Sequence, residues 1–310
     1  MSSSRKLPKS NTGRQKAMNT AKTKKDGLPS AKNAMTAATS TRLDTDNASY
    51  NALMDAVTAA EQVQREAGEA ADPWRFSLHN YIANYFKGLN SGIVIKEIPN
   101  SARSYYKLAT GNKKIPITNT DEQLLEWGQK IITGDAKRVG DGGYVITLPT
   151  IAAFTAVFNS AKAAITAFSN AKTALTDAQT AVNAKETEMN SLILRMWNEI
   201  ETTYSELDPP AKRSAARQWG VKYLFIGNPA IVSGTITNST TGLPIAGVTV
   251  KLMGSNTKTI TNINGYYVLN TSLYGDLELI AKITGYTENT TDILMENGGT
   301  MLVNVMMVHK

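Results

Sequence analysis

The segment Ile231-Val232-Ser233-Gly234-Thr235-Ile236 opens a series of short β-branched runs in the last eighty residues of the chain. Four further runs follow it, and Gly, Asn and Pro separate them: residues 248–252, 266–269, 277–281 and 302–306. Short strands at nearly even spacing, with turn residues between them, are typical of an antiparallel sandwich or barrel. We therefore predict an antiparallel β-sandwich over residues 230–310.

The turn residues of this region fit the same interpretation. Asn264-Gly265 supplies the positive φ angles of a tight hairpin turn just before the next strand. Pro244 has no amide proton to donate and suits a loop or a strand edge, while Gly247 lets the chain bend into the strand that follows. The predicted strands are therefore separated by turns with a physical basis.

The order of these motifs resembles that of the carboxypeptidase regulatory-like domain, a transthyretin-like β-sandwich. The residues that carry the resemblance are 234–236, 242–250, 261–267 and Gly285-Tyr286, so it concerns about a quarter of the chain. The resemblance implies a non-catalytic domain that stabilises a neighbour, acts as a spacer, or binds proteins or sugars. If the ligand is a sugar, the candidate ligand-facing aromatics are Tyr266, Tyr267, Tyr274 and Tyr286. The alternative is that these rings are ordinary strand and core aromatics.

The positive charge of the chain is concentrated at its N-terminus. Of the formal net charge of +7, residues 1–42 contribute +9, and the remaining residues contribute −2. This basic arm has almost no large apolar residues, so we predict that it is disordered or extended when free. It suits an acidic partner, either nucleic acid or an acidic protein groove, or it is a solvated tail. The candidate partner-binding residues of the arm are Arg5, Lys6, Lys9, Arg14, Lys16, Lys22, Lys24 and Lys25.

The middle of the chain, residues 43–220, is predicted to be an α-helical bundle. Residues 150–208 contain no Gly or Pro, and their apolar positions recur at heptad spacing, which predicts one long helix or a helical hairpin. Residues 43–67 supply an antiparallel partner. Asp72-Pro73-Trp74 is predicted to begin a separate aromatic helix. A linker, residues 221–229, then leads into the sandwich.

Few residues in the chain support chemistry. The absence of cysteine excludes disulfides, thiolate catalysis and cysteine-ligated zinc. The two histidines are His79 and His309, and His79 is predicted to be structural rather than the base of a hydrolase. The sequence has no calcium loop and no phosphate-binding Gly-rich loop. We therefore expect no catalytic, cofactor or metal site; a hydrolase in the aromatic helical region is the least favoured alternative.

The first residues and the hydropathy of the chain bear on its location. No apolar segment follows the basic residues at the N-terminus, so a secretory signal is not expected. No stretch is predicted to be apolar enough to span a membrane. We expect synthesis in the cytoplasm without a signal peptide.

These features together predict a non-enzymatic structural or adaptor protein of a bacterial multi-subunit particle, such as a phage virion or a phage-tail-like contractile injection machine. The arm would anchor the protein to neighbouring subunits of a homo- or hetero-oligomer, or to nucleic acid, and the β-sandwich would be exposed for interaction. The alternative is a carbohydrate- or cell-surface-binding protein that uses the sandwich.

Overall fold

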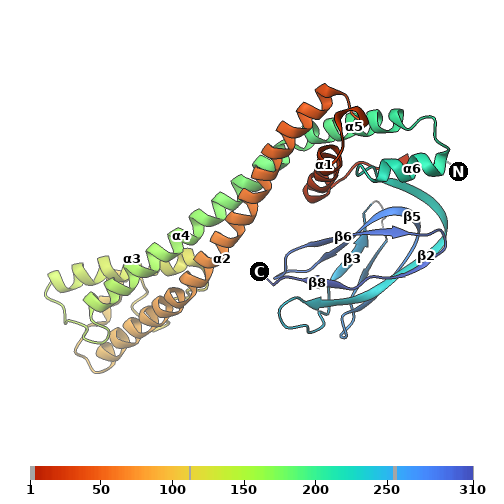
Figure 1. Ribbon diagram of the computed structural model, residues 1–310. Coiled ribbons are helices and arrows are strands. Elements are labelled where there is room, and N and C mark those ends of the chain that lie inside the picture. The colour runs from red at the N-terminus through yellow and green to blue at the C-terminus, as the bar shows by residue number, and fades with distance from the viewer. Residues whose placement is uncertain (1–3, 112, 254–256, 310) are drawn as a thin grey trace. The chain divides into compact units, whose positions relative to one another are not determined.

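The computed structural model describes residues 4–111, 113–253 and 257–309 of the protein (Figure 1). The chain folds into two compact units. Unit 1 consists of Met1–Asp55 together with Thr180–Lys310, and unit 2 consists of Ala56–Gln179. Unit 2 is helical, and unit 1 combines helices with a β-sheet, which confirms the predicted multidomain α + β class. The domain boundaries after residues 42, 220 and 229 stay predictions.

Unit 2 is built on parts of two long helices, α2 (Ala37–Val94) and α4 (Ile151–Ala184). They lie side by side in Figure 1, and at Gly68 they approach closely, because a Cβ there would lie 3.3 Å from the Phe168 ring. The 3-10 helix η2 (Asn100–Tyr106) and α3 (Asp121–Gly140) complete the unit. All four elements contribute to its core, for example with Phe86, Tyr106, Ile131 and Phe154.

Helix α2 continues through Pro73, which corrects the prediction that Asp72-Pro73-Trp74 starts a new helix. Asp72 pairs with Arg75 instead, at 2.8 Å between Oδ1 and Nη1. A proline inside a helix removes one backbone hydrogen bond and costs about 3 kcal/mol. Ala71 and Leu78, on either side of the proline, are fully buried, and the packing of both flanks outweighs that cost.

The predicted heptad segment forms one helical run rather than a hairpin. Helices α4 and α5 (Glu186–Thr203) are separated by Lys185 alone, and the backbone of Lys185 stays in the right-handed helical region. The heptad residues are buried in both units, for example Phe154 and Phe158 in unit 2 and Met189 and Ile193 in unit 1. The chain therefore does not turn back within residues 151–203.

The same run is apolar enough to meet a length and composition criterion for crossing a membrane. Residues 151–203 contain an 18-residue window with a mean hydropathy of 1.4, of which 22% is buried. By length and composition, this run contradicts the prediction that no stretch is apolar enough to span a membrane. Its alanines raise the hydropathy without large side chains. The criterion is weak, because a helix that lines the core of a soluble protein can also meet it.

The β-domain of unit 1 is built around two long strands, β2 (Tyr223–Asn238) and β5 (Tyr266–Lys282), which pair antiparallel. Strand β2 already begins inside the predicted linker 221–229. The remaining strands of the domain are short: β3 (Thr249–Leu252), β4 (Lys258–Ile260), β6 (Asn289–Met295), β7 (Thr300–Leu302) and β8 (Val305–Met307). Strands β3 and β6 pair antiparallel with β5, and β4 with β3.

Strands β7 and β8 pair parallel with β2, so the domain is mixed rather than wholly antiparallel. Because β6 and β2 both run antiparallel to β5, they share one direction. The chain keeps this direction from β6 into β7, which makes the pairing with β2 parallel. At the predicted hairpin, Gly265 has a φ of 69° and Asn264 does not have a positive φ. A Cβ on Gly265 would lie 2.5 Å from the Ile236 carbonyl oxygen, so only glycine fits there.

The N-terminal arm is folded, which corrects the prediction of a disordered or extended segment. It forms β1 (Ser4–Arg5), α1 (Asn11–Asp26) and the 3-10 turn η1 (Ser30–Lys32). Ser10 caps α1 by accepting a hydrogen bond from the Gly13 amide at 3.0 Å. The buried face of α1 consists of small residues, one methionine and an arginine: Gly13, Arg14, Ala17, Met18 and Ala21. Such a face packs closely against its neighbours but contains little apolar area to reveal it in the sequence.

Candidate functional site

The arm lies on the outer face of the β-domain. On β5 the odd-numbered residues Leu269, Leu277 and Leu279 belong to the core, so the even-numbered residues face outward. Glu278 faces outward but is only 5% exposed. Helix α1 covers it, because a Cβ on Gly13 would lie 3.2 Å from its Oε1. The backbone of the arm is held by pairing of β1 with β2 and by a 3.2 Å hydrogen bond from the Lys6 amide to the Lys222 carbonyl.

A cluster of four charged side chains, the Lys222 cluster, lies where the arm meets the sheet. It consists of Lys16 of α1, Lys222 just before β2, Glu278 of β5 and Asp292 of β6. Glu278 and Asp292 are directly opposite each other in the β5–β6 register. The Lys222 Nζ lies 2.7 Å from Glu278 Oε1 and 2.7 Å from Asp292 Oδ1, and Lys16 forms an ion pair with the other oxygen of Asp292.

The pKa shifts of Lys222 and Asp292 show that interactions with oppositely charged neighbours outweigh the effect of burial on both groups. Burial lowers the pKa of Lys222, but hydrogen bonds to Asp292 and Glu278 outweigh it and hold that pKa above its ordinary value. Burial likewise raises the pKa of Asp292, but Lys16 and Lys222 outweigh it and hold that pKa below its ordinary value. Lys222 and Asp292 therefore form an ion pair at neutral pH.

Further contacts fix the arm to the helices of unit 1. The side chain of Arg14 is 2% exposed; it pairs with Glu186 and donates a 2.9 Å hydrogen bond from Nε to Asn190 Oδ1. Lys22 and Lys25 both pair with Asp44 of α2, at 2.9 and 2.8 Å. The arm therefore contacts α2 and α5 as well as the sheet.

Most of the predicted partner-binding residues contact the protein's own acids and amides. Besides Arg14, Lys16, Lys22 and Lys25, Arg5 lies 3.4 Å from Glu201, and Lys24 donates a 2.8 Å hydrogen bond to Gln218. In the described part of the chain, the side chains of Lys6 and Lys9 have no ion-pair partner, and Lys9 is exposed. The acidic groove that the arm's charge predicts is, in this structure, largely intramolecular.

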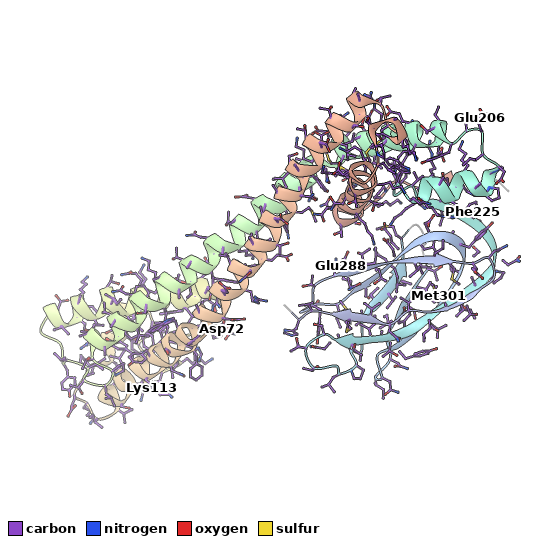
Figure 2. All side chains as sticks on the ribbon, viewed as in Figure 1. Asp72, Lys113, Glu206, Phe225, Glu288 and Met301 are labelled. Carbon is purple, nitrogen blue, oxygen red and sulfur yellow. The ribbon has the colours of Figure 1, made fainter. Side chains whose placement is uncertain are left out.

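The four candidate tyrosines do not form one binding surface. Tyr267 is 1% exposed and donates a 2.7 Å hydrogen bond to the Val303 carbonyl, so it is a core residue and not a ligand-facing one. Tyr286 contacts His309 edge-on, with ring centroids 4.9 Å apart. Tyr274 stacks on Phe225, labelled in Figure 2, also at 4.9 Å.

Tyr266 is exposed, but it lies at the opposite end of the β5–β2 pairing from Tyr274. At about 3.4 Å per residue, the two positions on β5 are about 27 Å apart. One sugar ring cannot bridge this distance, so the stacking platform of the carbohydrate-binding alternative is not assembled.

Residues of β2, β5, β7 and β8 form an uncharged surface with exposed apolar side chains on the outer face. The sequence analysis did not identify this surface. We call it the open face: Ile231, Tyr266, Val268, Leu302 and Met306. Ser233 lies between Val268 of β5 and Leu302 of β7 in the register, which places these two side chains in one row. Leu302 is 69% exposed and Met306 is 67% exposed.

The sequence shows the contribution of β2 to the open face but not the contributions of β7 and β8. The alternation of Ile231, Ser233 and Thr235 with Val232, Gly234 and Ile236 shows a two-sided strand. Without the parallel pairing of β7 and β8 with β2, nothing in the sequence brings Leu302 and Met306 beside that strand.

In the aromatic region of unit 2, His79 contacts a hydroxyl group. His79 is exposed, and its Nδ1 lies 2.7 Å from the Thr118 hydroxyl. The polar network nearby is sealed in the core: Tyr85 donates to Asp135 at 2.5 Å, and Arg138 donates to Tyr106 at 2.9 Å. Among residues 4–111, 113–253 and 257–309, no three His, Cys, Asp or Glu side chains are grouped to hold a metal ion.

Comparison with known proteins agrees with the resemblance of the C-terminal domain. Residues 232–310 match the family model described as CarboxypepD_reg-like domain. This match covers about a quarter of the chain, and the helical part has no assigned family. No curated protein matches the chain as a relative.

Three solved structures that are similar to part of this chain come from different kinds of protein. A cohesin–X-dockerin complex from Acetivibrio cellulolyticus is 23% identical over 25% of this chain and 56% of its own, with a TM-score of 0.21. The minor pilin GBS52 of Streptococcus agalactiae is 16% identical over 28% of this chain and 47% of its own, with a TM-score of 0.23. A 3-chlorocatechol 1,2-dioxygenase from Rhodococcus opacus 1CP is 13% identical over 27% and 61%, with a TM-score of 0.22. The matched segment thus spans about half the length of these chains.

Proposed function

Because residues 232–310 match a family of non-catalytic β-sandwich domains, we propose that this protein is a structural or adaptor protein whose β-domain binds another protein subunit. The observation that supports this proposal most directly is the open face. Its neighbouring outward positions, Ser233, Asn270 and Thr300, are uncharged as well. An uncharged surface that exposes several large apolar side chains is typical of a protein–protein interface.

The partner in this proposal is a protein with a matching apolar, uncharged surface, and it differs from the partner that the arm's charge suggests. Most basic side chains of the arm contact groups within unit 1, so in this proposal the open face and not the arm makes the main contact. A bacterial multi-subunit particle, such as a phage virion or a contractile injection machine, remains our proposed setting.

The experiment compares two exposed leucines of the same domain. Leu302→Glu places a charge on the open face, and Leu243→Glu places one on a turn; the two leucines are 69% and 65% exposed. The native mass of the assembly is measured for the full chain purified from the producing cells, and the subunit that contacts position 302 is identified by cross-linking.

We expect Leu302→Glu to release the protein from its assembly and Leu243→Glu to leave the assembly intact, because burying an unpaired charge at an interface is unfavourable. A wild-type protein that is a monomer in its native extract would contradict the proposal. So would an assembly that both variants join equally well.

A further inference from the structure

The Lys222 cluster has the composition and geometry of an amide-forming site. Lys222 supplies an amine, Asp292 supplies a carboxyl group, and Glu278 supplies a second carboxyl group that touches the amine. The amine Nζ is 2.7 Å from Asp292 Oδ1, so the carbon atom of that carboxyl group is one bond further away. Groups held at such near-attack distances can react as if their concentrations were about 10⁵–10⁸ M.

We propose that Lys222 and Asp292 condense to form an intramolecular isopeptide bond, with Glu278 relaying the protons. The bond would join the chain just before β2 to β6, across β5. It would close a covalent loop between residues 70 positions apart. The inference concerns the domain's own chemistry and does not depend on the proposed function.

The reaction balances without any co-reactant. Lys222 first loses a proton to the neighbouring carboxylates, and the neutral amine then attacks Cγ of the protonated Asp292 carboxyl group. The new Nζ–Cγ bond forms and a C–O bond breaks. Of the three ammonium protons, one stays on the amide nitrogen, and two leave with the carboxyl oxygen as one water molecule.

Glu278 is placed to carry a proton between the two reacting groups. Its Oε1 contacts the Lys222 amine at 2.7 Å. Its Oε2 is buried and has no hydrogen-bond partner in the described part of the chain. Neither oxygen therefore has a structural hydrogen bond other than that to Lys222, and Oε2 is free to take up and return a proton during the reaction.

The surroundings of the cluster favour condensation over hydrolysis. Residues next to the cluster in sequence are apolar and buried: Ala17, Val221, Leu277 and Ile293. Helix α1 covers Glu278 and brings Lys16 to Asp292, so the folded arm shields the relay carboxyl group from water, while the reacting carboxyl group of Asp292 is 30% exposed. Excluding water also removes the solvation of the ion pair, which must exchange a proton before the amine can attack.

Among residues 4–111, 113–253 and 257–309, the other lysine–carboxylate pairs lack this combination. Lys282 and Glu288 are 3.0 Å apart, but their side chains are 71% and 43% exposed. Lys25 contacts both Asp26 and Asp44, but those carboxyl groups are 49% and 42% exposed. In the Lys222 cluster, Lys222 is 17% exposed and Glu278 is 6% exposed, although Asp292 is 30% exposed. The pairing of a half-buried amine with a buried relay carboxyl group distinguishes this site.

The test is the mass of the denatured full-length protein, followed by mapping of its proteolytic peptides. We expect the wild-type protein to be lighter than its sequence by the mass of one water molecule, with the peptides of Lys222 and Asp292 joined. Lys222→Ala and Asp292→Ala should restore the full mass. Glu278→Gln, which keeps the side-chain shape, should leave the two peptides separate in a protein whose circular dichroism is unchanged.

The matched control is Lys282→Ala, which removes an exposed lysine of an ordinary ion pair and should keep the link. A folded wild-type protein with the full sequence mass and free Lys222 and Asp292 peptides would overturn the proposal, whatever the variants do. A link between Lys16 and Asp292 would also contradict it, since it would assign the amine to the wrong lysine. Full linkage in Glu278→Gln would show that Glu278 does not relay the protons.

Discussion

The buried side chain of Arg14 holds helix α1 of the arm against helix α5. Its guanidinium group is satisfied by Asn11, Asn190 and Glu186, so three different positions along the chain meet at one side chain. Glu186 is 53% exposed, and its ion pair with Arg14 is therefore screened by solvent. The hydrogen bond from Arg14 to Asn190 accounts for more of the stability, because an unsatisfied amide is costly in the interior.

We predict that Arg14→Ala destabilises unit 1 by about 1–3 kcal/mol, the usual cost of leaving buried polar groups without partners. The measurement is thermal or urea unfolding followed by circular dichroism. Lys9→Ala is the control, since Lys9 is exposed and has no ion-pair partner among the described residues; it should change stability by less than about 0.5 kcal/mol. Equal stability of the two variants would mean that α1 does not depend on Arg14.

The start of α2 is stabilised by a side chain from another helix. Glu199 of α5 accepts a 2.8 Å hydrogen bond from the Thr36 amide and a 2.6 Å hydrogen bond from the Thr39 hydroxyl. A carboxylate at a helix N-terminus satisfies free amides and interacts favourably with the helix dipole. Burial raises the pKa of Glu199, but these hydrogen bonds outweigh it and hold the pKa below its ordinary value of 4.5.

This cap predicts a pH dependence of stability. A carboxyl group with a lowered pKa in the folded state contributes stability above its unfolded pKa, and that contribution is lost as the pH falls through the folded pKa. The free energy of unfolding should therefore decline as the pH falls below about 4.5, and Glu199→Gln should make the decline shallower. Urea unfolding at several pH values measures it. A decline that is equally steep in Glu199→Gln would exclude Glu199 as its source.

The arm connects the parts of unit 1, from the β-sheet to α2 and α5. Strand β1 pairs with β2, Lys16 pairs with Asp292, and Lys22 and Lys25 pair with Asp44. Several of these contacts are exposed ion pairs, which salt weakens over distances of about 10 Å at 0.1 M ionic strength. The buried face of α1 does not depend on salt in this way.

We predict that trypsin cleaves the arm of the isolated full chain slowly, although the arm is rich in lysine, because a packed helix must open before a protease can bind it. Cleavage after Lys16, Lys22, Lys24 and Lys25 should be several times faster in Arg14→Ala and should accelerate only slightly in high salt. Rapid cleavage of the wild-type arm would mean that the arm is not docked in solution. Peptide mapping over time gives the rates.

The sequence by itself determined the β-domain, its turn glycines and the heptad helices, because these depend on local periodicity and local backbone conformation. The match of residues 232–310 to a known family agrees with that interpretation. The sequence also indicated the pairing partner of the long helix, since residues 43–67 carry a complementary apolar stripe.

Only the tertiary structure decided that the arm is folded and that α2 continues through Pro73. It also decided that β7 and β8 pair parallel with β2, and that Lys222, Glu278 and Asp292 lie together. Each of these depends on contacts between residues far apart in the chain, which local patterns do not record. The arm is the clearest case. Its composition predicts disorder, but α1 is stabilised by a small-residue face and by acids that stand between 19 and 276 positions further along the chain.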